Sequence, residues 1–332
     1  MERVSKDIWI YAEVKDGLPV PKCAELLAKA QEFKERDASS RLCAVLLGWK
    51  LDKALEMLRQ YGADVIYCAD HEGLRNYRLT AYSEIIAETA EAYCPNIFLF
   101  NASTQGSELA ATVAAKLRTG AAAHCIDVQP DESGNMICMV PAFGGKVVSE
   151  ILIPRHRPQI ASLSAGSLPK AALPPCSDTK IIEMSTAALQ KDLGEEILSV
   201  EPIPPSGGVA LENAQIVLCA GRGAADPQTM SHLYALAERL GAAVGCTRSF
   251  LDENDSLDER SMIGVSGKSV QPQLYMSFGV SGASQHICGI GKSRYIVSVD
   301  RDSESKMFGH SDFGAVGDAD RILCALLRQL EH

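Results

Sequence analysis

The sequence has no closely spaced pair of cysteines, although it contains eleven cysteines in 332 residues. No two of them form a CxxC motif, which excludes an iron–sulfur cluster or a zinc knuckle built from one local motif. Most lie inside apolar runs, as Cys43 does within Arg41–Leu47. We therefore expect reduced thiols that are buried as small hydrophobic side chains.

Long apolar runs and targeting segments are also missing. No window approaches the ~18 uninterrupted apolar residues of a membrane-spanning helix, so we expect no membrane insertion. The first residues, MERVSKDIWIYAEVKDG, show neither the apolar stretch of a secretory signal nor the Arg- and Ser-rich character of an organelle presequence. We expect a cytoplasmic protein.

Positive charge is scarce, with 32 Lys and Arg against 42 Asp and Glu, and a net charge of −10. This balance argues against nucleic acid as the main partner, because phosphate binding needs a basic face. His71, His124 and His156 are scattered without the spacing of metal ligands, so no metal site is expected. Neither a GxGxxG fingerprint nor a P-loop occurs.

What is present is an alternation of short apolar runs with longer amphipathic stretches. With 46% hydrophobic and 22% charged residues, the chain suits a globular protein of two domains. The first half predicts strands at 7–14, 42–47, 64–69 and 96–101, and helices at 21–36, 52–61, 80–93 and 107–117. Such βαβ units predict a mostly parallel sheet flanked by helices.

After Gly120 the pattern changes to short segments separated by turn residues. We expect strands at 122–128, 136–141 and 146–153, some of them antiparallel, and one more at 181–184. The stretch 162–175 is rich in Ser, Pro and Ala and has no clear period. All of these belong to the first domain.

The predicted domain boundary is EPIPPSGG at Glu201–Gly208, where three prolines and two glycines form a connector. The predicted organisation is an N-terminal α/β domain at 1–200, a linker at 201–208 and a second α/β domain at 209–332. The second begins with a strand at 214–219 and a helix that Asp226 caps, with Pro227 at its first position.

Four loops of the second domain follow predicted strands or apolar stretches and are rich in glycine and polar residues. Ala220–Gly223 would expose backbone N–H groups to an anion with Arg222 beside them, although a structural tight turn is equally compatible. Gly245–Arg248 and Ile263–Lys268 supply further hydroxyl and cationic groups, and Arg248 taken alone could be an ordinary surface cation. The tip of Tyr295–Arg301 carries Asp300.

The segment Leu274–Gly289 is the most informative. A strand ends in Gly279–Ala283, and we expect a helix to begin near Ser281 with Gln285 and His286 on its first turn. The last loop, 313–318, ends in Asp318, which is expected to cap the helix 319–330. Because the carboxyl ends of parallel strands converge, these residues together predict a nucleotide or dinucleotide cofactor in the second domain.

Residues 242–318 resemble the FAD domain of electron-transfer flavoprotein alpha subunits. The chain keeps that family's LY, GVSG, QH and G at the right spacing between Leu274 and Gly289. The first half resembles the family as well, in IWIYAE, LLG, GAD, KLRTG and PAFGG, so the resemblance covers nearly the whole chain. It implies a Rossmann-like FAD-binding domain at the C-terminus.

The resemblance implies specific roles. Arg222, Ser281 and Asp318 would hold the ribityl, pyrophosphate and adenosine parts of FAD. Arg248 would lie over the isoalloxazine ring, Ser266 would reach its N5 region, and His286 its N1/O2 edge. A cation and a donor there would stabilise the negative charge of a reduced flavin. The whole set of expected cofactor-binding residues is Arg222, Thr247, Arg248, Ile263, Gly264, Val265, Ser266, Ser281, Gly282, Ala283, Ser284, Gln285, His286, Asp300 and Asp318.

The chain departs from the family pattern at several positions. Val265 stands where a Gln is common, which removes one ring contact, and Ser266 keeps the hydroxyl of the usual Thr. Asp300 replaces the usual Asn, so that side chain can accept hydrogen bonds but not donate them. Ser277, Ser284 and Ser298 replace apolar or small residues.

The family resemblance implies an electron carrier subunit, not a stand-alone enzyme. It would pair through its first domain with a smaller beta subunit and dock on an acyl-CoA-type dehydrogenase. Residues 247–267 look closer to an anaerobe-type branch with electron-bifurcating members, in which NADH is the donor and ferredoxin or flavodoxin is a separate partner. The alternative is a transfer enzyme on the same fold that binds NAD or another adenine nucleotide without flavin redox chemistry.

Overall fold

The computed structural model describes residues 5–37, 39–142, 147–164, 174, 176, 178–191, 194–201, 211, 214–265, 267–291 and 293–330. The chain divides into two compact units, Met1–Val200 (unit 1) and Glu201–His332 (unit 2). Of the predicted connector, only Glu201 lies among the described residues, so its role as a linker stays a prediction.

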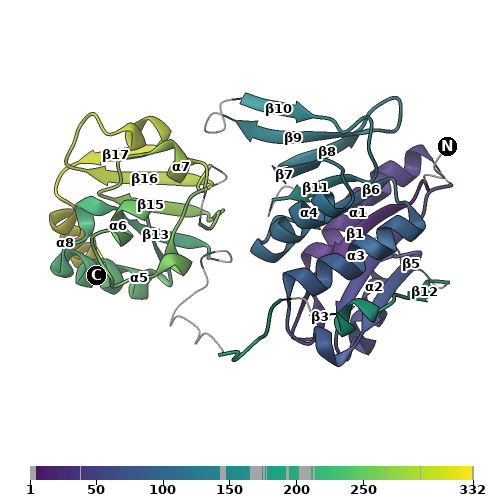
Figure 1. The fold of residues 1–332 in the computed structure, drawn as a ribbon. Helices are drawn as coiled ribbons and strands as arrows, with labels where there is room; N and C mark the ends of the chain where they lie inside the picture. The colour runs from purple at the N-terminus through teal and green to yellow at the C-terminus, as the bar shows by residue number, and fades with distance from the viewer. Residues whose placement is uncertain are drawn as a thin grey trace. The chain divides into compact units, whose positions relative to one another are not determined.

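Unit 1 is built on a seven-stranded sheet in the order β12-β5-β4-β1-β6-β11-β7, and all its strand pairs are parallel (Figure 1). Its strands are β1 (Ile8–Ala12), β4 (Leu42–Gly48), β5 (Val65–Asp70), β6 (Ile97–Asn101), β7 (Ala121–Cys125), β11 (Gln159–Leu163) and β12 (Lys180–Glu183). The crossovers between successive strands from β1 to β7 are helices, as is usual for parallel pairing.

Alternating residues of each strand of unit 1 face two separate cores. Ile8 and Ile10 of β1 pack with side chains of α1 (Lys22–Arg36) and α2 (Asp52–Gln60). Trp9 and Tyr11 point the other way, into a core that includes side chains of α3 (Leu79–Tyr93) and α4 (Thr104–Lys116). Both faces of the sheet are therefore covered by helices, and its central strands are buried throughout.

Short elements complete unit 1. An antiparallel three-stranded sheet consists of β8 (Asp127–Pro130), β9 (Met136–Ala142) and β10 (Val147–Ile151), which confirms the change of pattern expected after Gly120. The remaining elements are β2 (Val14–Lys15), β3 (Leu18–Pro19), η1 (Glu72–Leu74) and η2 (Ala187–Gln190).

Strand β11 was not anticipated from the sequence, although it lies inside the main sheet. Its five residues are all buried, and two of them are polar. Gln159 accepts a hydrogen bond from the backbone N–H of Met136, and Ser162 accepts one from the backbone N–H of His124. The buried polar groups are thus satisfied by neighbouring backbone, which an alternation of apolar and polar residues does not reveal.

Unit 2 contains a five-stranded parallel sheet in the order β14-β13-β15-β16-β17. The strands are β13 (Ile216–Ala220), β14 (Ala243–Cys246), β15 (Leu274–Phe278), β16 (Tyr295–Asp300) and β17 (Phe313–Val316). Two parallel sheets with flanking helices confirm the predicted α/β class, and the doubly wound strand order of unit 2 is Rossmann-like.

The two faces of the unit 2 sheet are covered differently. One packs against α5 (Pro227–Leu240) and α8 (Ala319–Gln329). The other packs against irregular backbone that includes Ile263 and Val270, and against the single turn α7 (Ser284–Ile287). The other short elements are η4 (Arg222–Ala224), α6 (Arg248–Leu251), η5 (Glu259–Ser261) and η6 (Lys306–His310).

Helix ends in unit 2 follow the capping signals in the sequence. Asp226 accepts a hydrogen bond from Thr229 N at 2.9 Å with Pro227 at the first helical position, and Asp318 accepts one from Arg321 N at 3.0 Å. No described helix is both long and apolar enough to cross a membrane.

The helix expected near Ser281 begins three residues later, at Ser284. The backbone just before it is not helical, because Gly282 has φ +75° and Ala283 has φ −57° with ψ 140°. Gln285 and His286 still stand on its single turn, as expected.

The cysteines are all free thiols, and seven of the eleven are buried. Cys219 and Cys246, for example, lie inside β13 and β14, where burial raises their pKa values. This agrees with their expected role as small core side chains.

Candidate functional site

The strand order of unit 2 reverses between β13 and β15. From β13 the chain moves outward to β14, and then returns to the other side of β13 to form β15, β16 and β17. The loops after β13 and β15 therefore start side by side at the carboxyl edge of the sheet and lead to helices on opposite faces. This is the point at which open parallel sheets bind ligands.

Those two loops approach each other backbone to backbone. A Cβ on Gly221 would lie 2.1 Å from the carbonyl oxygen of Gly279, and a Cβ on Gly279 would lie 2.6 Å from Gly223. Gly279 also has φ +66°, and Gly223 N donates to Gly279 O at 3.1 Å. Only glycine fits positions 221 and 279, so these residues fix the shape of the edge.

A second glycine contact joins the segment after Met262 to α7. Gly264 has φ +145°, and a Cβ there would lie 2.9 Å from the carbonyl oxygen of Gln285. Val265 N donates to the same carbonyl at 2.9 Å. The backbone of 263–265 is thereby held against α7 and lines a hollow beside it.

Two hollows open at this edge and share Ser249, Ser281 and Ala283 as lining residues. The first has a volume of about 490 Å³ and the second about 330 Å³. Each lies in the size range of small-molecule sites. The first is lined by Arg222, Gly223, Ser249, Gly279, Ser281, Ala283, Asp300, Asp302, Glu304, Ser305 and Lys306. The second is lined by Thr247, Arg248, Ser249, Asp252, Met262, Ile263, Gly264, Val265, Val280, Ser281, Ala283, Gln285 and His286.

The first hollow is polar and carries charges of both signs. Arg222 and Lys306 supply cations, and the Arg222 guanidinium lies 3.9 Å from Glu253 in an exposed ion pair. Asp300 and Asp302 add carboxylates, and Asp300 accepts a hydrogen bond from Asp302 N at 3.1 Å. Cations of this kind suit phosphate groups, whereas carboxylates suit hydroxyl donors such as those of a ribose.

The second hollow combines apolar side chains with one guanidinium. Ile263, Val265 and Val280 form apolar walls. Arg248 stands at the start of α6, which Thr247 caps by accepting from Phe250 N at 3.3 Å. Its guanidinium lies 3.7 Å from Asp252 and 3.5 Å from Glu259, pairs that are exposed and therefore weak. The guanidinium can thus turn toward a ligand at small energetic cost.

His286 lines the second hollow, yet both of its ring nitrogens are bonded to protein atoms. Nδ1 lies 3.0 Å from Ile263 O, and a carbonyl only accepts, so Nδ1 carries the proton. Nε2 then accepts from the Tyr275 hydroxyl at 2.7 Å. Burial lowers the pKa of His286, which favours this neutral form. Donation from His286 to a ligand would require Tyr275 to release Nε2, so the donor role stays a prediction.

The structure brings together most of the residues predicted from the sequence. Those that line one of the two hollows are Arg222, Thr247, Arg248, Ile263, Gly264, Val265, Ser281, Ala283, Gln285, His286 and Asp300. Arg248 and His286 line the same hollow. Their roles as ligands of a cofactor stay predictions.

Three of the predicted residues that the structure describes do not line the hollows. Gly282 is buried against Met307, and Ser284 is exposed at the start of α7. Asp318 caps α8 and pairs with Arg301, and these bonds lower its pKa, so it has a structural role of its own. Ser266 lies outside the described residues.

Five polar residues that line the first hollow were not predicted from the sequence, namely Ser249, Asp302, Glu304, Ser305 and Lys306. Ser249 follows Arg248 directly and could have been included with it. The segment 302–306 has no glycine or motif that marks it. It reaches the hollow because η6 packs over the loop after β15, where a Cβ on Gly282 would lie 2.3 Å from Met307 N.

Comparison with known proteins agrees with this geometry. Residues 8–189 match the electron transfer flavoprotein domain, and residues 210–291 match the electron transfer flavoprotein FAD-binding domain. The chain is 32% identical to the electron transfer flavoprotein subunit alpha of Thermoanaerobacterium thermosaccharolyticum, over 98% of each chain. It is 30% identical to the corresponding subunit of Clostridium acetobutylicum, over 98% of this chain and 97% of that one.

A third relative carries an enzyme's name. Subunit LctC of a lactate dehydrogenase (NAD(+),ferredoxin) from Acetobacterium woodii is 29% identical, over 98% of this chain and 77% of that subunit. The matches favour the flavoprotein interpretation over a nucleotide-dependent transfer enzyme. The chain therefore belongs to the electron transfer flavoprotein family as an alpha subunit, and unit 2 contains that family's flavin-binding domain.

Proposed function

We propose that this chain binds FAD in unit 2 and, paired with an electron transfer flavoprotein beta subunit, carries electrons between a dehydrogenase and a second redox partner. The observation that carries the proposal is the glycine-lined edge between β13 and β15, which opens onto two adjoining hollows. One hollow is lined mainly by polar and charged residues and the other has apolar walls, as the pyrophosphate with its ribose and the flavin ring system would require.

The residues present fit two parts of FAD, the pyrophosphate with its ribose and the ring system. Arg222 and Lys306 would bind the pyrophosphate, and Asp300 would accept from a ribose hydroxyl. Val265 and Val280 would pack on the ring system, with Arg248 close to it. When bound, FAD supplies reversible transfer of one or two electrons.

Two side chains would tune the electrostatics around the ring. Arg248 would offset negative charge on the cofactor, because a cation in a partly enclosed site stabilises nearby negative charge. Tyr275 holds the His286 imidazole in one orientation through its hydrogen bond to Nε2. The imidazole would therefore present a fixed dipole at the wall of the second hollow.

Unit 1 would supply the contact with the beta subunit. Large apolar side chains are exposed on and just after β10, namely Val147, Val148, Ile151 and Leu152. Four large apolar side chains exposed within six residues suggest an association surface. A Val148→Asp substitution is expected to weaken the heterodimer, as measured by gel filtration, without changing flavin binding by unit 2.

The relatives suggest the class of electron donor and acceptor. The A. woodii relative is named for NAD(+), ferredoxin and lactate. A 27% identical relative from Anaerotignum propionicum is named acryloyl-CoA reductase electron transfer subunit beta. We infer a dehydrogenase acting on an acyl-CoA or a similar substrate as partner, with NADH as donor and ferredoxin or flavodoxin as acceptor if the complex bifurcates electrons.

The test is to purify the chain with its beta subunit and to count flavins and AMP per heterodimer. Two flavins together with oxidation of NADH indicate bifurcation, whereas one flavin plus AMP indicates a simple carrier. Retention of NAD instead of FAD after gel filtration would support the transfer-enzyme alternative. A colourless complex that does not bind added FAD would refute the proposal.

Variants then locate the flavin. Arg248→Ala is expected to shift the flavin absorption spectrum and to lower the reduction potential, because a nearby cation stabilises the reduced form. The matched control is Arg294→Ala, since Arg294 is also exposed but contacts Tyr295 and lines neither hollow. Equal spectra for both variants and the wild type would place the flavin elsewhere.

A further inference from the structure

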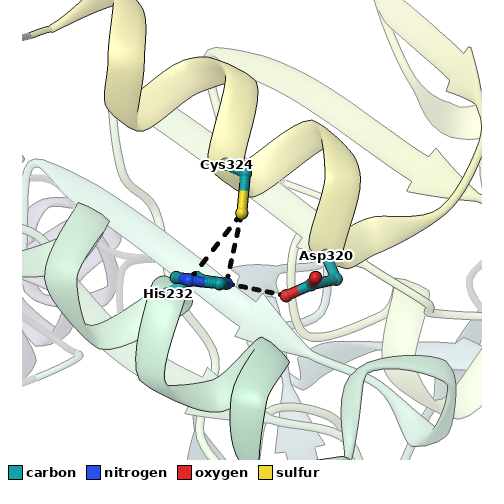
Figure 2. A group of neighbouring side chains, drawn as sticks. All are labelled: His232, Asp320 and Cys324. Atoms are coloured by element: carbon teal, nitrogen blue, oxygen red, sulfur yellow. Dashed lines mark hydrogen bonds and ion pairs between the residues drawn. The ribbon is translucent and has the colours of Figure 1, made fainter.

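Three side chains of different chemistry meet on the helical face of unit 2, on α5 and α8. His232 comes from α5, and Asp320 and Cys324 come from consecutive turns of α8 (Figure 2). One potential metal-ligand atom from each lies within 4.8 Å of the others. Among the described residues, no other group of three or more His, Cys, Asp or Glu side chains brings its potential ligand atoms this close together.

The packing of α5 against α8 brings the three potential ligand atoms together. α5 and α8 pack side by side on the same face of the sheet, although His232 and Cys324 are 92 residues apart in sequence. Asp320 and Cys324 are spaced i, i+4, so both point from α8 toward α5. The site is therefore assembled by the core packing of unit 2.

The side chains of His232, Asp320 and Cys324 contact one another through hydrogen bonds in the structure. His232 Nδ1 lies 2.7 Å from Asp320 Oδ1, and the second carboxylate oxygen accepts from Gln228 at 3.3 Å. The sulfur of Cys324 lies 3.4 Å from Nδ1 and 3.7 Å from Nε2 of the same ring. Because these distances are similar, the sulfur lies over the face of the ring, as Figure 2 shows.

We propose that His232, Asp320 and Cys324 form a binding site for a divalent transition metal, with Zn²⁺ as the best match. Imidazole, carboxylate and thiolate are the ligand types that zinc takes. Bond lengths of about 2.0–2.3 Å in tetrahedral geometry place ligand atoms about 3.3–3.7 Å apart. The sulfur–Nδ1 distance is already in that range, and the Nδ1–Oδ1 distance must lengthen by about 0.6 Å.

The remaining change is a rotation of the imidazole that turns one nitrogen toward both the sulfur and the carboxylate. The bond to Gln228 would stay in place and orient the carboxylate. The His232 and Asp320 side chains are 29% and 26% exposed, so an ion and one water ligand can reach the site. Carboxylate and thiolate together neutralise the two positive charges of the ion.

Such an ion would join α5 to α8 and so stabilise unit 2. Neither hollow at that edge is lined by His232, Asp320 or Cys324. The group shares no residue with the lining of the hollows, so metal binding and flavin binding can be measured separately.

The experiment uses the full chain with its beta subunit, treated with a chelator and titrated with Zn²⁺ and then with Co²⁺ as a spectroscopic probe. We expect one equivalent of Zn²⁺ to be bound in competition with a chromogenic chelator. Co²⁺ should give intense tetrahedral bands in the red, beyond the absorption of oxidised flavin, and a thiolate charge-transfer band.

Three variants, Cys324→Ser, Asp320→Asn and His232→Gln, should each weaken Zn²⁺ binding at least about 100-fold, since even the loss of an outer-shell partner costs 10–100-fold. Cys288→Ser is the matched control, because Cys288 is exposed and lies outside the group. Asp320→Asn keeps the shape of the side chain, so it remains informative if another variant folds poorly. Equal affinity in wild type and in all three variants, or a Co²⁺ spectrum without a thiolate band, would overturn the proposal.

Discussion

The two parallel sheets of this chain differ in what covers them. In unit 1 each face of the sheet packs against two helices of nine or more residues. In unit 2 only one face packs against such helices, and the other is covered by irregular backbone that includes Ile263 and Val270 and by the single turn α7. This backbone is tied to neighbouring elements, since Ile263 N donates to Cys246 O and Val265 N to Gln285 O, each at 2.9 Å. The irregular covering, rather than a helix, therefore lines the second hollow of the candidate cofactor site.

Both units nevertheless use a glycine where a strand end meets the next segment. A Cβ on Gly221 would lie 2.1 Å from Gly279 O, and a Cβ on Gly106 would lie 2.2 Å from Asn101 O. We expect Gly221→Ala and Gly106→Ala to destabilise their own units by about 2–4 kcal/mol each. Only Gly221→Ala should also weaken FAD binding, by at least about tenfold, because it forces apart the loops at the edge.

The two effects can be read separately. Trp9 and Trp49, the only tryptophans, both lie in unit 1, so tryptophan fluorescence follows the unfolding of that unit and flavin release follows unit 2. Gly309→Ala is the control, since a Cβ there meets nothing within 4 Å. If Gly106→Ala released flavin as readily as Gly221→Ala, the contrast between the units would be lost.

Much of this architecture could be predicted from the sequence. The alternation of apolar runs and amphipathic segments predicted α3 and α8 and the start of α5 to within a residue, because each has a clear period and, in α5 and α8, a cap. The segment 313–318, expected to be a loop, instead contains the edge strand β17 (Phe313–Val316). Strand β11 could not be predicted, since its buried Gln159 and Ser162 are satisfied by backbone groups distant in sequence.

The candidate site was predictable where glycines and motif residues mark it. Asp318 caps α8 as the sequence predicted, and its pair with Arg301 competes with the ligand role that the family resemblance implies. The lining segment 302–306 was missed because only tertiary packing of η6 brings it to the edge.

Ser277 and Ser298, two positions at which the chain departs from the family pattern, are hydrogen bonded to each other. These residues are register partners on β15 and β16, and both are buried. Ser277 Oγ donates to Ser298 Oγ at 3.0 Å, Ser298 bonds to Ser311, and Ser311 donates to Met307 O at 2.8 Å. Two substitutions that look unrelated in sequence form one chain of hydroxyls inside unit 2.

This chain of hydroxyls predicts an asymmetry between two alanine variants. Ser298→Ala removes the acceptor for the buried Ser277 hydroxyl and should cost about 1–3 kcal/mol, whereas Ser277→Ala should cost about 0.5–1.5 kcal/mol. The double variant should cost less than the sum, because each single change breaks the same bond. Urea unfolding followed by flavin release measures all three, with the exposed Ser284→Ala as control. Additive costs would show that the hydroxyls do not act as a unit.

A smaller effect is expected at Asp318. Asp318→Ala should slightly lower the stability of unit 2, because the cap of α8 is lost. Asp318→Asn should largely keep the cap while losing the pair with Arg301. Affinity for FAD, measured by fluorescence titration, should change by less than about threefold in both, which is under 1 kcal/mol. A larger loss of affinity would restore the ligand role that the family resemblance implies.

The smallest effect is a pH dependence confined to unit 2. Burial lowers the pKa of His286, so the unfolded chain binds this proton more readily than the folded one. The stabilisation is complete above the unfolded pKa of about 6.5 and is lost as pH falls through the lower folded pKa. His286→Gln should flatten this part of the stability profile of unit 2, whereas His310→Gln, at an exposed position, should not. An unchanged slope in His286→Gln would mean that the imidazole of the folded chain is protonated as easily as in the unfolded one, and that the neutral Tyr275–His286–Ile263 arrangement does not persist in solution.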